Sequence, residues 1–231
     1  MIPMPHSRVL KVLLFLACWK TMSSAAAKPH VIVFGKWITV PWYQEMAAKP
    51  IPLQIRALFV DTRLREYTLG AAHEITDRLF IVRRAFRVND SLPDEPATVP
   101  RWLWQRGGWL LVDRVTGRVS PVNLPEFDGF YSATSWYRDY AAYCGVSDDG
   151  KKLYAIVAQI GRRKPVLRKP LPGAEIADDA PPDSACPAPA WQRGPARVSF
   201  ELTNGEKQTF AIRGHVVDVV NDPEEEEEAA K

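Results

Sequence analysis

The sequence has few of the residues that most often carry metal and nucleophilic chemistry: four histidines and three cysteines among 231 residues. His30, His73 and His215 lie far apart, so no two of them have the spacing of a zinc site. The run His73-Glu-Ile-Thr-Asp77 begins like a zinc-protease helix, but Asp77 stands where the second histidine is needed. No nucleophile-elbow motif is present either. The sequence therefore predicts no metal and no cofactor, and it assigns no catalytic residue.

No apolar run approaches the ~20 residues that a membrane-spanning helix needs. Val12–Trp19 (VLLFLACW) is apolar, and it follows the basic residues Arg8 and Lys11 and precedes three alanines that end at Ala27. This order is typical of a secretory signal peptide, so we predict that residues 1–27 are an export signal cleaved after Ala27. In the alternative, Cys18 at the end of Phe-Leu-Ala-Cys is the lipidated cysteine of a bacterial lipoprotein.

The chain also lacks a strong charge of one sign, since its formal net charge is +3. Removing residues 1–27 removes three basic residues and no acid, which leaves 27 basic and 27 acidic residues. Six acids, Asp222 and Glu224–Glu228, gather at the C-terminus, so residues 221–231 are predicted to be a solvated acidic tail. The remaining body is mildly basic, well short of what nucleic-acid binding requires.

Cleavage after Ala27 would leave two cysteines, Cys144 and Cys186. In an oxidising compartment two cysteines indicate one disulfide, which would tie the proline-rich segment around Cys186 to a predicted strand that holds Cys144. The alternative is one buried and one exposed thiol. Signal and cysteine pair together predict a periplasmic or secreted protein, and the short basic start favours a bacterial source.

Twenty prolines and thirteen glycines interrupt the chain, so helical signals are few. Short helices are expected at most over Pro41–Ala48 and Gly70–Asp77, whereas short strands with turn signals recur along the chain. This pattern predicts an all-β fold, an antiparallel sandwich or barrel, in a single domain over residues 28–220. Residues 171–195, rich in proline and alanine, are expected to form a surface loop. The predicted strands are His30–Val40, Leu53–Val60, Arg63–Leu69, Arg78–Val88, Arg118–Leu124, Tyr137–Val146, Lys152–Ile160, Pro165–Leu171, Arg197–Thr203 and His215–Val220. Lys152–Ile160 is apolar on both faces, which predicts a central strand of its sheet.

Three turns are predicted between strands. Asp61-Thr62 connects one hairpin, and Arg106-Gly107-Gly108 is expected to connect another, between Trp102–Gln105 and Trp109–Asp113. At the third, a two-residue turn at Asn204-Gly205 would place Phe210 on the wrong face of its strand, because a one-residue slip flips every side chain. A three-residue loop, 203–205, with a left-handed Gly205 restores the match and places Val198 opposite Phe210.

Two of the strand connections carry a resemblance. Gly108–Val119, with its Asp-Arg-Val-Thr-Gly turn, resembles the strand–turn–strand unit of quinoprotein-type β-propellers. Val146–Tyr154 (VSDDGKKLY) is similar to the strand turn of the exported propeller repeats in TolB-like proteins. The resemblance implies a small or partial β-propeller as the alternative fold, although no strict repeat runs through the chain.

Aromatic residues are dense between positions 102 and 143. Exposed, they would form a stacking platform for a sugar or a surface for a protein partner. The alternative is an aromatic core, since such residues pack well in β-sheets. Arg162-Arg163-Lys164 with Arg168-Lys169 predicts either a solvated edge hairpin or a site for an acidic partner. The candidate ligand-binding residues are Trp102, Trp104, Trp136, Tyr137 and Arg138.

The function that these features favour is that of an exported, non-catalytic β protein that binds a ligand or a protein partner in the cell envelope. An envelope protein or a polysaccharide is the expected partner, and nucleic acid is not. The alternative is an exported hydrolase that acts on glycans or esters with catalytic residues dispersed along the sequence.

Overall fold

A computed structural model describes residues 29–43, 49–90, 102–129, 132–147, 149, 152–175, 186–202, 205–213 and 216–219. The predicted signal, residues 1–27, and the predicted tail, residues 221–231, lie outside the described residues. The described part of the chain contains no helix long and apolar enough to span a membrane.

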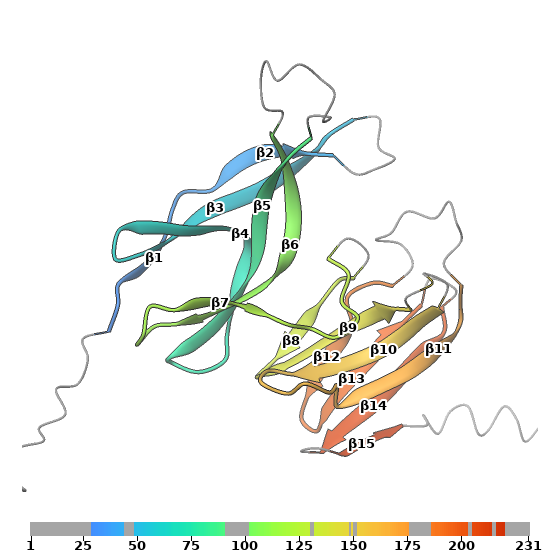
Figure 1. The fold of residues 1–231 in the computed structure, drawn as a ribbon. Helices are drawn as coiled ribbons and strands as arrows, with labels where there is room; N and C mark the ends of the chain where they lie inside the picture. The colour runs from blue at the N-terminus through green and yellow to red at the C-terminus, as the bar shows by residue number, and fades with distance from the viewer. Residues whose placement is uncertain are drawn as a thin grey trace, which may run out of the picture.

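The protein is all-β, as the sequence predicts, and it combines a barrel-like ring with a pair of facing antiparallel sheets (Figure 1). Its first seven strands form one sheet, and the remaining eight form two four-stranded sheets. In chain order the strands are β1 (Ile32–Phe34), β2 (Ile38–Trp42), β3 (Ile51–Val60), β4 (Arg63–Glu74), β5 (Leu79–Asn89), β6 (Trp102–Asp113), β7 (Val119–Val122), β8 (Ser135–Tyr137), β9 (Tyr140–Val146), β10 (Lys152–Gln159), β11 (Leu167–Glu175), β12 (Ala190–Arg193), β13 (Ala196–Glu201), β14 (Lys207–Arg213) and β15 (Val216–Val219).

Five strands close the ring. β2, β3, β4, β5 and β6 pair antiparallel in chain order, and a parallel pairing of β6 with β2, at Trp42 opposite Trp104, completes the circle. β1 and β2 both pair with β3, at successive parts of its length. The predicted strand His30–Val40 is therefore two strands with a break that begins at Gly35, whose amide donates to the Ala57 carbonyl (2.8 Å). β7 extends the sheet beside β6.

The hairpin between β3 and β4 has the predicted two-residue turn. Val60 pairs with Arg63, and both Asp61 (φ 50°) and Thr62 (φ 67°) adopt left-handed backbone conformations. Such a turn matches the twist of the flanking strands because both central residues have positive φ. The Asp61 carboxylate also accepts the Val31 amide (3.0 Å) and contacts the His30 ring, which ties the start of β1 to this turn.

The predicted hairpin at Arg106-Gly107-Gly108 is wrong, because β6 continues without a turn from Trp102 to Asp113. Arg83 pairs with Trp109 and Ala85 with Arg106, so β6 holds one extra residue between them. The glycines therefore form a β-bulge, where a missing side chain lets two strands approach closely. A Cβ at Gly107 would lie 3.1 Å from the Phe86 ring.

The helix expected over Gly70–Asp77 is also absent. β4 runs through Glu74, with a register shift between Leu69 and His73 and with Gly70 at φ +70°, and Ile75–Arg78 form the bend that follows. The other helix was expected over Pro41–Ala48. Its first two residues, Pro41 and Trp42, belong to β2, and residues 44–48 lie outside the described part. For Gly70–Asp77, the pairing of β4 with its neighbouring strands in the sheet outweighed the local helical signal.

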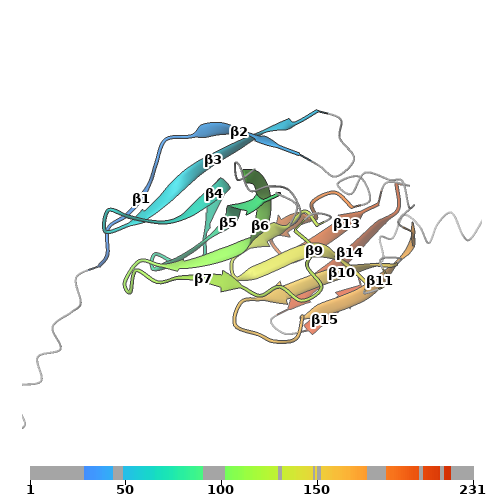
Figure 2. The same cartoon turned by 45° about the horizontal axis from the view of Figure 1, so that its top comes forward.

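β8–β11 and β12–β15 form two antiparallel sheets that overlie one another (Figure 2). The predicted register of the β13–β14 hairpin is confirmed: Val198 pairs with Phe210, and the Leu202 amide donates to the Glu206 carbonyl (2.8 Å). Gly205 is left-handed (φ 87°), as the three-residue loop requires, while residues 203 and 204 lie outside the described part. The predicted strand Tyr137–Val146 instead divides into β8 and β9 around a turn at Arg138 (φ 53°).

β10 lies between β9 and β11 and is buried on both faces, which confirms the prediction of a central strand. One face, with Ala155 and Val157, packs against the second sheet of the sandwich. The other, with Ile156 and Ala158, packs against β7 and the loop after it, and there the sandwich meets the ring. Two further clusters fill the ring itself. Whether residues 28–220 form a single domain stays a prediction.

The predicted disulfide between Cys144 and Cys186 is present, with both residues buried between the two sheets of the sandwich. The expected surface loop over residues 171–195 is wrong at both ends, since residues 171–175 belong to β11 and Ala190–Arg193 form β12. Both are edge strands, where a proline without an amide hydrogen is tolerated. Residues 176–185 lie outside the described part.

The two segments that resemble propeller repeats are both strand–turn–strand units. In the first, the Asp113 carboxylate accepts the amides of Val115 (2.8 Å) and Thr116 (3.3 Å), and Gly117 is left-handed. In the second, the Ser147 hydroxyl accepts the Lys152 amide (2.9 Å). The turns connect β6 with β7 and β9 with β10, within a ring and a sandwich, and the propeller resemblance itself stays untested.

Candidate functional site

Aromatic and arginine side chains gather at the end of the ring where β2 closes on β6. Trp102 and Trp104 alternate with Leu103 along β6, so both point to the same face. Arg87 lies opposite Trp104 on β5, and its guanidinium carbon lies 5.4 Å from the Trp104 ring and 5.7 Å from the Trp102 ring. We call this group the tryptophan–arginine end; its members are Trp42, Arg87, Trp102, Trp104 and Arg106.

Exposure increases outward along this group. Trp42 is 2% exposed, and the Arg106 guanidinium covers its ring at 3.8 Å. Trp104 is half-buried and packs edge to face on Tyr67, with ring centroids 5.1 Å apart. Trp102, the outermost, is 54% exposed. The inner rings belong to the core of the ring of strands, so they hold the outer tryptophan on a rigid base while leaving it open to solvent.

Arg87 is exposed and forms no ion pair within the part of the chain that the structure describes. Elsewhere on the surface, four arginines each have a carboxylate partner: Arg78 with Asp113, Arg84 with Glu66, Arg114 with Glu74 and Arg168 with Glu126. A cation that lies near two indole rings can bind an anionic group of a ligand.

The other predicted ligand-binding residues lie elsewhere, on the β8–β9 hairpin. Trp136 packs edge to face on Trp109 (5.2 Å) and lies parallel to the His73 ring (6.0 Å). The adjacent Tyr137 packs against Trp191 (5.4 Å). Arg138 is the left-handed residue of the hairpin turn, and its carbonyl lies 2.7 Å from His73 Nε2. The structure does not join this group to Trp102 and Trp104.

These contacts explain where the second group belongs. Trp136 and Trp109 are part of the apolar cluster in which the ring meets the sandwich, and the Trp191 indole donates to the Ser135 carbonyl (3.2 Å). Trp136, Trp109 and Tyr137 are half-buried. A role of Trp136, Tyr137 and Arg138 in ligand binding stays a prediction. The contacts that the structure gives them hold the β8–β9 hairpin against its neighbours.

Arg87 and Arg106 were not among the predicted site residues. The alternation of Arg78–Val88 places Arg87 on one face of its strand, but only the register of β5 against β6 shows that it lies beside the two tryptophans. For Arg106, the misassigned glycine turn removed it from the strand altogether. A signal for Arg106 was present in the pattern Trp102-x-Trp104-x-Arg106, which places three side chains on one face of a strand.

Four carboxylates of the described residues are each paired with an arginine. The Arg78 guanidinium holds the pKa of Asp113 well below its usual range, and Arg114 likewise lowers the pKa of Glu74. Glu126 has a left-handed backbone (φ 53°), and its carboxylate accepts a hydrogen bond from Arg168 Nε (2.7 Å). Among the described residues, no three of His, Cys, Asp and Glu gather as a metal site. No protein-family model, curated protein or solved structure matches the chain.

Proposed function

We propose that the protein is an exported, non-catalytic β protein that binds a polysaccharide in the cell envelope through its tryptophan–arginine end. The observation that carries this proposal is the arrangement of Trp102, 54% exposed, with Arg87 against its ring and no carboxylate paired with Arg87 among the described residues. An exposed indole face beside a guanidinium combines a stacking surface with a cation, which is a pairing suited to recognition of an anionic ligand that has a flat apolar face. Export rests on the predicted signal at residues 1–27, and the Cys144–Cys186 disulfide agrees with an oxidising compartment.

The chemistry of the two exposed groups indicates what kind of sugar would bind. An indole face provides apolar area on which a sugar ring can stack. A guanidinium provides paired donors that match the two oxygens of a carboxylate. The combination favours a polysaccharide that carries uronic acid units over a neutral one. A protein partner that presents an acidic group beside a flat side chain is the alternative occupant.

Affinity electrophoresis through gels that contain polygalacturonate tests the proposal. Trp102→Ala should weaken retardation about tenfold, because the variant removes the stacking face. Trp37→Ala is the matched control, since Trp37 is also exposed (47%) and also carries an arginine, Arg56, 4.4 Å from its ring. That variant should migrate like the natural protein.

The role of Arg87 is tested by a second comparison. Arg87→Gln should weaken binding to polygalacturonate and leave binding to a neutral polysaccharide, hydroxyethyl cellulose, unchanged. Equal retardation of all variants, or equal losses for Trp37→Ala and Trp102→Ala, would contradict the proposal. Shortening of the polysaccharide during incubation would instead favour the alternative of an exported glycan hydrolase.

A further inference from the structure

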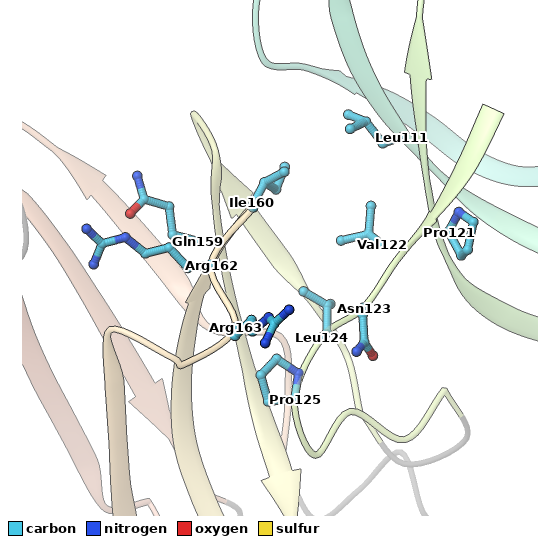
Figure 3. A pocket seen from close by; sticks show the side chains of 11 residues that line it. Leu111, Pro121, Val122, Asn123, Leu124, Pro125, Gln159, Ile160, Arg162 and Arg163 are labelled. Carbon is cyan, nitrogen blue, oxygen red and sulfur yellow. The ribbon is translucent and has the colours of Figure 1, made fainter. Parts of the chain in front are cut away.

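A groove separates the ring from the sandwich on the side where β7 leaves the ring. It is about 600 Å³ in volume, within the range of pockets that hold small organic molecules. One wall comes from β6, β7 and the segment that follows β7, and the other comes from the end of β10 and the turn into β11 (Figure 3). None of these residues belongs to the tryptophan–arginine end.

More than half of the residues that line the groove are apolar. Leu124, only 8% exposed, lines the groove together with Val122 and Ile160 (Figure 3), and it belongs to the cluster that packs the ring against the sandwich. The groove is therefore anchored to a packed core on one side and open to solvent on the other. Its apolar lining residues are Leu111, Pro121, Val122, Leu124, Pro125 and Ile160.

The charged residues that line the groove are both basic. Arg162 and Arg163 come from the β10–β11 turn, where Gly161 is left-handed (φ 80°), and no aspartate or glutamate is among the lining residues that the structure describes. Figure 3 shows the Arg163 side chain turned toward Leu124 and Pro125, whereas Arg162 turns back beside Gln159. Arg163 is exposed and forms no ion pair with any described residue. A cation thus stands at one end of an apolar groove.

We propose that this groove binds an amphipathic monoanion, a carboxylate with a hydrocarbon chain, with the carboxylate at Arg163 and the chain along Val122, Leu124 and Ile160. The apolar residues supply area that a chain of methylene groups can remove from water. The guanidinium supplies paired hydrogen bonds and a charge for the head group, which fixes the direction of the chain in the groove. This site is separate from the polysaccharide site, and each proposal can fail without the other.

Isothermal titration calorimetry with dodecanoate, kept in its monomeric range, tests the proposal. Dodecanoate should bind at one site, and dodecanol and dodecyltrimethylammonium, with the same chain and no negative charge, should bind at least fivefold more weakly. Arg163→Gln should weaken dodecanoate binding about fivefold. Lys164→Gln is the matched control, because Lys164 is exposed in the same turn and does not line the groove. It should change the affinity less than twofold.

A second variant tests the place of the chain. Asn123→Trp puts a large ring at an exposed lining position and should abolish binding, while the far-ultraviolet circular dichroism of the protein stays unchanged. The proposal is overturned if dodecanoate does not bind, or if dodecanol binds as tightly as dodecanoate. Equal effects of Arg163→Gln and Lys164→Gln, binding undiminished by Asn123→Trp, or binding to anionic vesicles without binding of monomeric dodecanoate would overturn it as well.

Discussion

Loss of the Cys144–Cys186 disulfide should lower the free energy of unfolding by about 4 kcal/mol. The bridge joins residues 42 positions apart, and in the chain-entropy model a closed loop of that length restricts the unfolded chain by about this amount at 25 °C. Both cysteines are buried, Cys144 at 1% and Cys186 at 2% exposure, in the cluster that holds Val198 and Leu202. Reduction should therefore leave the native packing in place and act mainly by releasing the unfolded chain.

Urea unfolding followed by tryptophan fluorescence, with and without dithiothreitol, measures the effect. A protein with both cysteines replaced by alanine should lose at least as much stability as the reduced protein, because it also loses two buried sulfur atoms. That variant should be insensitive to dithiothreitol, which controls for effects of the reagent on the rest of the chain. If reduction changes the free energy of unfolding by less than about 1 kcal/mol, the estimate from loop length is refuted.

Two further predictions concern the turns of the ring. Thr62→Gly should raise the free energy of unfolding by about 0.5–1 kcal/mol, because the β-branched Thr62 has a φ of 67° that glycine adopts without steric strain. Thr39→Gly, within β2, should lower the free energy of unfolding. The opposite order of the two variants in urea unfolding would refute the argument. Asp113 has a folded pKa below its usual value of 3.8 because Arg78 donates to it, so its stabilising contribution is complete above about pH 4 and is lost as the pH falls toward the folded pKa. Asp113→Asn should therefore reduce the loss of stability between pH 5 and pH 2, as measured by thermal unfolding, and an unchanged slope would contradict this account.

Local patterns predicted much of the fold because each fixes a short-range feature. The register of β13 against β14 followed from two apolar faces and one left-handed glycine, Gly205. The central position of β10 followed from a strand that is apolar on both faces. The pairing of Cys144 with Cys186 followed from the absence of any other cysteine once the signal is set aside.

The remaining features depend on pairings that the sequence does not display. Gly107-Gly108 reads equally as a turn or as a bulge, and only the continuous pairing of β6 with β5 decides between them. The shared face of Trp102 and Trp104 could be predicted, but the place of Trp136 could not. Trp136 meets Trp109 and His73 because the sandwich docks on the ring, and this contact joins residues from three separate strands.

Hydrogen exchange of the protein with and without polygalacturonate tests the central claim, that the tryptophan–arginine end is the binding surface. The bound polysaccharide should slow exchange of the amides around Trp102–Trp104 in β6 and around Arg87 in β5. The amides of β13 and β14, on the far sheet of the sandwich, should exchange unchanged. Protection confined to the sandwich, or no protection under conditions in which the polysaccharide is bound, would contradict the account.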